Sequence, residues 1–197
     1  MMQVLLIFTK NPRLGKVKTR LAATLGDVEA LRIYRILLEK TRAAALAVRA
    51  SRWLFYSEEV EREDDWAAAS FEKKVQCPGD LGARMEDAFR QAFAAGATQA
   101  LIIGSDCPGL DGALLRQAFE QLAHSDFVLG PTPDGGYYLL GMRRFEPSVF
   151  RNIAWSTDAV RPGTLAAISA GGWTCAELPI LSDIDTEADW RAYLGTV

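Results

Sequence analysis

The feature that most constrains the fold is an alternation of short apolar runs with segments of helical periodicity. The expected strands are Val4–Phe8, Trp53–Tyr56, Ala100–Ile103, Phe127–Leu129, Tyr137–Leu140 and Trp173–Glu177. The first expected helix has Asp27 as its N-cap and runs to Arg42. The others run over Glu58–Ser70, from Gly82 to Phe93, and over Leu114–Leu122, Thr164–Ala170 and Glu187–Leu194. Such alternation predicts a three-layer, Rossmann-like α/β/α fold, in which helices cover both faces of a mostly parallel sheet. A length of 197 residues suits one domain, so we expect a single domain over residues 1–197.

The overall charge argues against several classes of partner. The chain carries 22 Lys and Arg against 25 Asp and Glu, with a net charge of −3 and a pI near 5.3. A broadly acidic protein lacks the basic face that nucleic acids and anionic membranes require. Its 3 cysteines are too widely spaced for a disulfide framework, and no apolar stretch approaches the roughly 20 residues of a membrane span. We therefore expect a cytoplasmic protein with small-molecule partners, no nucleic acid and no membrane span.

Against this acidic background, residues 10–20 form a basic block, K-N-P-R-L-G-K-V-K-T-R, with five cations and no acid. The block follows the first expected strand and leads toward a helix, where free backbone N–H groups and the positive helix end favour phosphate. Pro12 and Gly15 shape the turn, and the Lys and Arg side chains add charge-assisted hydrogen bonds. The spacing matches neither the Walker A pattern nor G-x-G-x-x-G. The block therefore predicts a phosphate-binding loop of another kind, with a solvated basic loop as the alternative.

Carboxylates stand at two further places where a divalent cation could bind. Asp106 lies in G-S-D-C-P-G, directly after the third expected strand. A divalent cation bound to phosphates takes one or two carboxylates, so Asp106 is a candidate ligand, with a turn or helix cap as the alternative. Asp183 and Asp185 fall on the same side of an extended segment and could complete a site begun by Asp106. Thr186 is the expected cap of the last helix, with Asp189 three residues on.

Two further features bear on the chemistry. P-T-P-D-G-G, at 131–136, stands between two expected strands; its glycines permit close approach of a ligand, and Asp-Gly is equally a hairpin turn. The chain has no G-x-S-x-G nucleophile elbow, and its only histidine, His124, falls in an expected surface turn. We therefore expect no histidine-based triad and no covalent enzyme intermediate.

The order of motifs along the chain resembles that of a known family. K-x-P-x-x-G-x-x-K-T-R-L near the start is followed by G-S-D-C-P, D-G-G-Y-Y-L-L-G, W-S-T and L-x-D-I-D-T. This series is similar to the glycosyltransferase-A-type (GT-A), radical-SAM/selenodomain-associated transferases of the nucleotide-diphospho-sugar transferase superfamily. It is also similar to the 2-phospho-lactate guanylyltransferases and, more distantly, to the molybdenum-cofactor guanylyltransferases. The resemblance spans nearly the whole chain and implies a single GT-A-like domain.

The resemblance also implies roles for individual residues. The first loop would hold a nucleotide, Asp106 would bind Mg²⁺ or Mn²⁺, and Asp185, with Asp183 second, would share the metal. The implied nucleotide- and phosphate-binding residues are Thr9, Lys10, Pro12, Gly15, Lys18, Thr19, Arg20 and Ser105. The implied substrate-binding residues on the acceptor or sugar side are Asp134, Gly135, Gly136, Trp155, Ser156 and Thr157, the last three in a motif without an assigned role. We expect Asp106, Lys18 and Arg20 to be the catalytic residues.

Three hypotheses about function follow. The first is a metal-dependent, glycosyltransferase-like enzyme that uses a nucleotide sugar or a nucleoside triphosphate. The second is a guanylyltransferase-like nucleotidyltransferase that releases pyrophosphate when it acts on a phosphorylated small-molecule acceptor. The third is a non-catalytic protein that binds nucleotide sugars on the same fold, because a fold alone does not establish activity.

Overall fold

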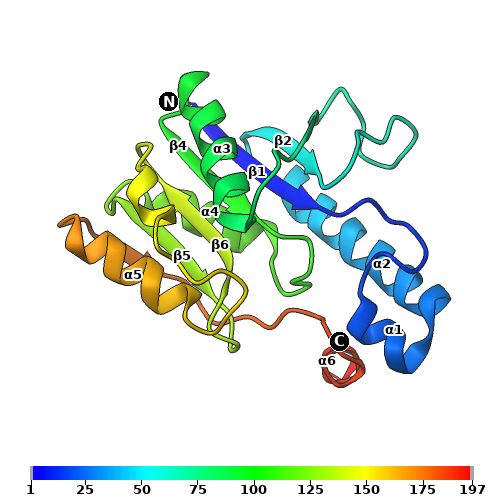
Figure 1. Cartoon of the computed structure of the whole chain (residues 1–197). Helices are drawn as coiled ribbons and strands as arrows, with labels where there is room; N and C mark the ends of the chain where they lie inside the picture. The colour runs from blue at the N-terminus through cyan, green and yellow to red at the C-terminus, as the bar shows by residue number, and fades with distance from the viewer. Residues whose placement is uncertain (1, 196–197) are drawn as a thin grey trace.

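The computed structural model describes residues 2–195 and shows a seven-stranded sheet between helices (Figure 1). The strands are β1 (Gln3–Thr9), β2 (Ser51–Tyr56), β3 (Glu72–Val75), β4 (Gln99–Ile103), β5 (Phe127–Pro131), β6 (Tyr137–Met142) and β7 (Cys175–Glu177). Their order across the sheet is β3-β2-β1-β4-β6-β5-β7. β6 runs antiparallel to β4 and β5, and the other neighbouring strands are parallel. The predicted α/β fold with a mostly parallel sheet is confirmed.

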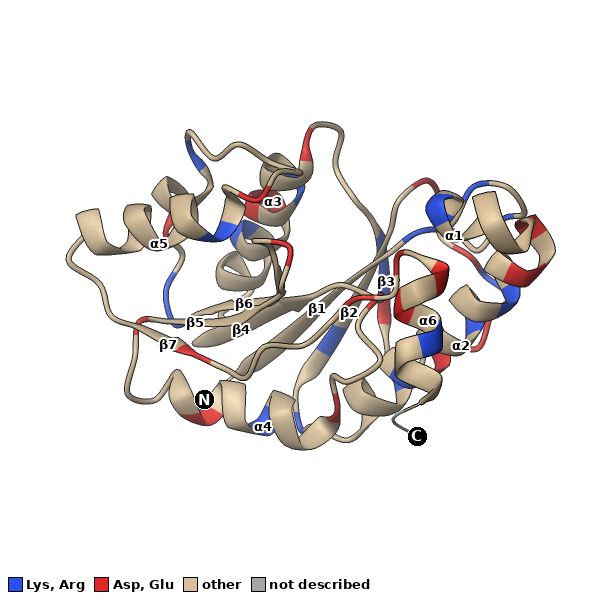
Figure 2. Ribbon diagram, turned by 90° about the horizontal axis from the view of Figure 1, so that it is seen from below, with Lys and Arg blue, Asp and Glu red and all other residues tan. Residues whose placement is uncertain are grey.

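Helices cover both faces of this sheet, as Figure 2 shows. They are α1 (Thr19–Leu25), α2 (Asp27–Leu46), α3 (Leu81–Ala94), α4 (Gly112–Gln121), α5 (Val160–Ala170) and α6 (Glu187–Leu194), with a short 3₁₀ helix, η1 (Pro147–Phe150). Leu5 and Ile7 of β1 pack in the core beneath α2 and α4, whereas Val4 and Leu6 pack in the core beneath α3 and α5. Successive strand residues point to opposite faces, so an apolar run such as β1 is buried on both sides.

A smaller core joins the last helix to the first two. Leu21 of α1, Ile33 of α2 and Trp190 of α6 are buried together, so the last helix lies beside the first two (Figure 1). The capping box that starts α6 is present: Asp189 N donates to Thr186 Oγ1, and Asp189 Oδ2 accepts from Thr186 N at 2.7 Å. These contacts fix where the acidic segment before α6 enters the fold.

Three local expectations are wrong. Residues 58–70 form turns rather than a helix, because the Asp64 carboxylate accepts hydrogen bonds from Tyr56 Oη, the backbone N–H of Trp66 and Lys73 Nζ. Side-chain bonds of this kind compete with the helical ladder. The basic block ends in a helix, α1, that was not expected. Asp27 is the first residue of α2 rather than its cap, since Gly26, with φ 81°, makes the abrupt turn between the two helices.

The hairpin interpretation of 131–136 is confirmed, because the segment connects the antiparallel strands β5 and β6. The three cysteines, all within the described part of the chain, are free. No helix between residues 2 and 195 combines the length and the apolar character that crossing a bilayer requires.

Candidate functional site

The polar segments after β1 and β4 meet at the carboxyl edge of the sheet, where open α/β folds bind ligands. Two adjoining cavities lie there. The main cavity, of about 530 Å³, reaches from the ends of β1 and β4 to α3. The loop cavity, of about 270 Å³, lies under the first loop and the start of α1. Both are lined by Lys10, Tyr34, Asp106 and Asp185, so they meet at these four residues.

Lys18 is the centre of the charge arrangement. It caps α1 in the left-handed conformation, with φ 49°, and its side chain is only 5% exposed. Its Nζ lies 3.0 Å from Asp106 Oδ2 and 3.0 Å from Asp185 Oδ1. The two carboxylates are 44% and 49% exposed, and Arg20 Nη1 lies 3.6 Å from the second oxygen of Asp185. The first loop, the loop after β4 and the segment before α6 thus converge on one buried amine.

The charges in this cluster shift the pKa values of its members. Burial lowers the pKa of Lys18, but the charges of Asp106 and Asp185 outweigh burial and hold that pKa above its ordinary value. Asp183, two residues before Asp185, is half-buried and lines the main cavity together with Asp106 and Asp185. Burial, followed by the charge of Asp106, raises the pKa of Asp183 to about 7. An excess of carboxylate around one amine is therefore the main electrostatic property of the site.

Tyr34 of α2 ties the strand ends together beneath this cluster. Its hydroxyl lies 3.0 Å from Thr9 Oγ1 and 3.2 Å from Ser105 Oγ, and it accepts from the backbone N–H of Lys10 at 2.9 Å. Burial, with the nearby charge of Asp106, raises the pKa of Tyr34. Thr9 and Ser105, both expected at the nucleotide site, are buried and hold the floor of the main cavity. In the sequence, Tyr34 falls on an apolar stripe of the expected helix that begins at Asp27, and such a stripe cannot reveal where a hydroxyl points.

The outer half of the first loop is held by the segment after β2. Arg13 forms ion pairs with Glu58 and Glu59, and the buried Asn11 donates through Nδ2 to Glu59 O at 2.9 Å. Gly15 has φ 71° and supplies a left-handed turn, for which glycine is suited. Arg13 and Gly15 line neither the main cavity nor the loop cavity, so they shape the loop.

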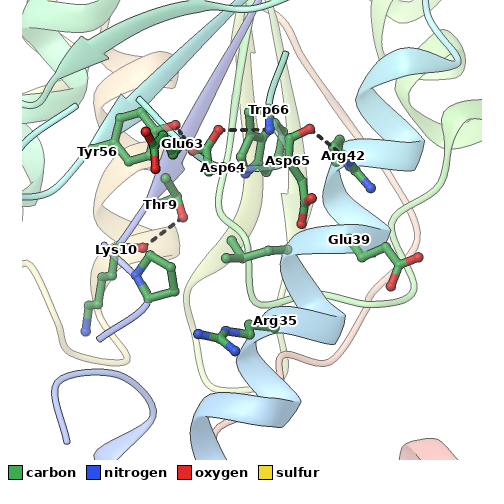
Figure 3. A pocket seen from close by; sticks show the side chains of 12 residues that line it. Thr9, Lys10, Arg35, Glu39, Arg42, Tyr56, Glu63, Asp64, Asp65 and Trp66 are labelled. Carbon is green, nitrogen blue, oxygen red and sulfur yellow. Dashed lines mark hydrogen bonds between the residues drawn. The ribbon is translucent and has the colours of Figure 1, made fainter. Parts of the chain in front are cut away.

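Pro12 faces a different hollow, shown in Figure 3, of about 290 Å³ between the first loop, α2 and residues 63–66. Several polar groups that line this hollow bond to one another (Figure 3). Asp64 accepts from Tyr56 and from the backbone N–H of Trp66, and Asp65 O accepts from Arg42 Nη1 at 2.6 Å. Thr9 and Lys10 border this hollow as well as the main cavity.

The residues expected on the acceptor side are only partly brought to the cavity. Ser156, in the left-handed conformation with φ 64°, lines the main cavity. Asp134 instead accepts hydrogen bonds from Thr132 Oγ1 and the backbone N–H of Gly136, which stabilises the turn between β5 and β6. Gly135, with φ 86°, packs so closely against residue 158 that an added Cβ would lie 2.3 Å from the Asp158 carbonyl oxygen.

The W-S-T motif forms a brace beside this turn. Trp155 packs its indole on Gly82 of α3, where an added Cβ would lie 2.2 Å from Nε1. Thr157 Oγ1 donates to Ala154 O at 2.7 Å and closes the loop. Trp155 and Thr157 do not line the main cavity. The segment therefore positions Ser156 at the cavity.

The donor set can be compared with the needs of a divalent cation. Asp106 Oδ2 and Asp185 Oδ1 both lie 3.0 Å from Lys18 Nζ, so the two carboxylates stand around the same amine. Among residues 2–195 no group of three or more His, Cys, Asp and Glu side chains has the geometry of a metal site. Two carboxylates suit Mg²⁺ or Mn²⁺ that takes its other ligands from substrate phosphates and water. The residues thus fit an ion that binds together with a nucleotide.

Comparisons with solved structures agree with the fold. A protein of Desulfovibrio desulfuricans G20, provisionally named a nucleotide-diphospho-sugar transferase, is 32% identical, with a TM-score of 0.87 over 94% of this chain and 84% of that one. A nucleotidyl transferase from Methanothermobacter thermautotroptrophicus is 14% identical, with a TM-score of 0.63 over 100% and 99% of the two chains. Rv0371c of Mycobacterium tuberculosis H37Rv, crystallised with manganese, is 16% identical, with a TM-score of 0.59 over 100% of both chains. The last two show a common fold alone.

The sequence comparisons define the family. No match was found among curated proteins. Residues 40–157 match the family described as "Uncharacterized protein conserved in bacteria (DUF2064)". The match covers more than half of the chain and includes Asp106, the D-G-G turn and the W-S-T brace. The chain therefore belongs to the DUF2064 family.

Proposed function

We propose that this protein is a metal-dependent transferase that acts on a nucleotide sugar or a nucleoside triphosphate. One observation carries the proposal: the buried Lys18 amine lies 3.0 Å from both Asp106 and Asp185, with Arg20 beside them, at the carboxyl edge of the sheet. Cations and carboxylates concentrated at one point suit a polyphosphate and a divalent cation together.

Each residue of the cluster has a role in this proposal. Asp106 and Asp185 would hold Mg²⁺ or Mn²⁺, which would neutralise the phosphates when bound. Lys18 and Arg20 stabilise negative charge on the leaving pyrophosphate or nucleoside diphosphate. Thr9 and Ser105, fixed by Tyr34, hold the ends of β1 and β4 in place beneath the first loop. The reaction then needs no covalent enzyme intermediate.

The comparisons support the transferase class. The D. desulfuricans protein carries the name of a nucleotide-diphospho-sugar transferase, and the M. thermautotroptrophicus protein that of a nucleotidyl transferase. The presence of manganese in the Rv0371c crystal supports a divalent cation on this fold. Glycosyl transfer would release a nucleoside diphosphate, and nucleotidyl transfer to a phosphorylated acceptor would release pyrophosphate.

Thermal unfolding with nucleoside triphosphates and nucleotide sugars tests the proposal. We expect one of them to raise the Tm in the presence of Mn²⁺, since a ligand at 100 times its Kd stabilises by about 2.7 kcal/mol. EDTA should abolish the rise. The proposal fails if no nucleotide raises the Tm, or if EDTA makes no difference.

A separate measurement distinguishes an enzyme from a non-catalytic binding protein. Incubation of the stabilising nucleotide with candidate acceptors should release pyrophosphate or a nucleoside diphosphate, and the product identifies the type of transfer. Stabilisation without release of either product would favour a binding protein on the same fold.

A further inference from the structure

The main cavity has a second cationic wall, on the side of α3. Arg84 of α3 and Lys10 of the first loop are the two cations that line this cavity, against Asp106, Asp183 and Asp185. Within residues 2–195 neither cation has a carboxylate within ion-pair distance. Arg90, on the same helix, is by contrast paired with Asp87.

Neutral groups hold Arg84 in place. Its Nε donates to Gly79 O at 2.9 Å, and its Nη1 lies 3.4 Å from Gln76 Oε1. Gln76 is itself fixed, because its Nε2 donates to Thr9 O at 3.2 Å and to Phe55 O at 3.1 Å. These contacts orient the guanidinium without neutralising its charge. Its Nη2 has no hydrogen-bond partner in the described part of the chain.

The hydrogen bonding of Arg84 differs from that of an arginine whose N–H groups are all used to hold the fold together. A guanidinium carries five N–H donors in a rigid fork, which matches the oxygens of phosphate and carboxylate. In Arg84, Nε and Nη1 make the positioning hydrogen bonds, and Nη2 remains available at the wall of the main cavity. Gln76 bridges the carbonyl ends of β1 and β2, so the position of Arg84 depends on the same strand ends that form the site.

The cavity geometry separates this cation from those of the first loop. Lys18 and Arg20 line the loop cavity, whereas Arg84 lines only the main cavity. The two cavities meet at Asp106 and Asp185. A substrate pair that reacts at these carboxylates would therefore have anion-binding groups on both sides of the reacting point.

We propose that Arg84, positioned by Gln76 and Gly79, forms a second anion subsite that binds a phosphate or carboxylate group of a substrate. The assignment rests on the proposed function, since it takes the reaction to occur at Asp106 and Asp185. The anion belongs either to the acceptor or to the nucleotide, and both share the chemistry that a guanidinium recognises.

Titration calorimetry on the full chain tests the subsite with inorganic phosphate, acetate, an unphosphorylated nucleoside and the matching nucleoside triphosphate with Mn²⁺. We expect Arg84→Gln to weaken phosphate or acetate binding by about 10-fold or more, since a charged hydrogen bond is lost. Binding of the nucleoside should change by less than about twofold. Arg84→Lys keeps the charge and loses the forked donor geometry, so its affinity for the anions should lie between those of the wild type and Arg84→Gln. Arg90→Gln is the matched control and should leave all four affinities unchanged.

Further outcomes identify the source of the anion and separate this inference from the proposed function. If Arg84→Gln weakens the binding of the triphosphate as well as that of phosphate, the nucleotide supplies the anion. If triphosphate binding is unchanged, the acceptor supplies the anion. If no nucleotide binds the wild type while phosphate or acetate binding still depends on Arg84, the proposed function fails and the subsite stands. The subsite is overturned if neither phosphate nor acetate binds at millimolar concentration, or if Arg84→Gln leaves both affinities unchanged. It is also overturned if Arg84→Gln weakens nucleoside binding as much as anion binding. Circular dichroism and the Tm of each variant confirm that the comparison is between folded proteins.

Discussion

Lys18 Nζ lies 3.0 Å from Asp185 Oδ1, although 167 positions separate the two residues in the sequence. The bond connects the first loop to the segment that leads into the last helix. Because Asp106 Oδ2 lies at the same distance from that amine, one lysine pairs with carboxylates from two distant segments. Its conformation is left-handed, which costs energy for a residue with a Cβ, so the contacts of its side chain maintain it.

Replacement of Lys18 tests the electrostatic role of this amine. Lys18→Met keeps an unbranched side chain of similar length and removes the charge. We expect the transferase rate to fall by about 100-fold or more, as on the loss of one electrostatic group that stabilises a transition state. Steady-state kinetics with the nucleotide identified by thermal shift would measure the loss.

Lys16→Met is the matched control, because Lys16 lies in the same loop, is exposed and lines neither cavity. We expect its rate to remain within about twofold of the wild type. Equal losses in the two variants would contradict a specific role for Lys18.

Asp106→Asn tests the metal. The asparagine keeps the size of the side chain and removes the charge that would hold a divalent cation. We expect the Mn²⁺-dependent part of the nucleotide Tm shift to disappear, while the free energy of unfolding without ligands changes by less than about 1 kcal/mol, since the side chain is 44% exposed. Thermal unfolding with nucleotide, with Mn²⁺ and with EDTA would measure both quantities.

Asp111→Asn provides the control for this substitution. Asp111 caps α4 through its bond to the Leu114 N–H, and asparagine serves as a cap almost equally well. Its metal-dependent shift should match that of the wild type. A large loss of unfolding free energy in Asp106→Asn alone would identify Asp106 as a structural residue.

The sequence predicted those parts of the fold in which the local pattern and the tertiary environment agree. β1 and β4 are buried on both faces, and their apolar runs predict this directly. β3 was missed because Glu72–Val75 is a short, charged strand that pairs with β2 at the edge of the sheet. The turns at 58–70 were also missed, since the bonds of Asp64 to Tyr56 and Lys73 depend on residues outside that segment.

The candidate site shows the same division. The basic block and Asp106 could be placed at one sheet edge, because loops after parallel strands share that edge. Tyr34 and Arg84 could not be identified, since an apolar stripe or a helical surface position does not determine which polar atom a side chain reaches. The brace formed by Trp155 on Gly82 is likewise a long-range contact, without a local signal in either segment.

Gly82→Ala tests that brace. An added Cβ would lie 2.2 Å from Trp155 Nε1, so the indole must move. Overpacking of this kind typically costs about 1–3 kcal/mol, and we expect a loss of that size in the free energy of unfolding by urea. Because Trp155 positions Ser156 at the main cavity, the KM for one substrate should also rise.

A double-mutant cycle with Trp155→Ala isolates the contact. Once the indole is removed, Gly82→Ala should cost little or even stabilise α3, since alanine is the better helix former by about 1 kcal/mol. An equal cost of Gly82→Ala in both backgrounds would show that the indole is not the source of the strain.

Asp126 should make the stability of the protein depend on pH. Its carboxylate accepts from the backbone N–H and the hydroxyl of Thr174, each at 3.0 Å, and from Arg143 Nη2 at 2.8 Å. The N–H of Thr174, followed by the Arg143 guanidinium, holds the pKa of Asp126 below its ordinary value. A lowered folded-state pKa stabilises the protein above the unfolded value of about 3.9, and that stabilisation is lost as the pH falls through the folded value.

We therefore expect Asp126→Asn to lower the free energy of unfolding at pH 7 by about 1–3 kcal/mol, since a hydrogen-bonded charge is lost. The difference from the wild type should begin to shrink as the pH falls below the unfolded value of about 3.9, and it should be lost once the pH passes the lowered folded-state pKa. Urea unfolding across this range measures the difference, with Asp158→Asn as a control at an exposed aspartate. Parallel pH profiles for the wild type and Asp126→Asn would contradict the prediction. Since Asp126 joins the start of β5 to the residue before β7, the same measurement reports how far this one carboxylate secures the last strand of the sheet.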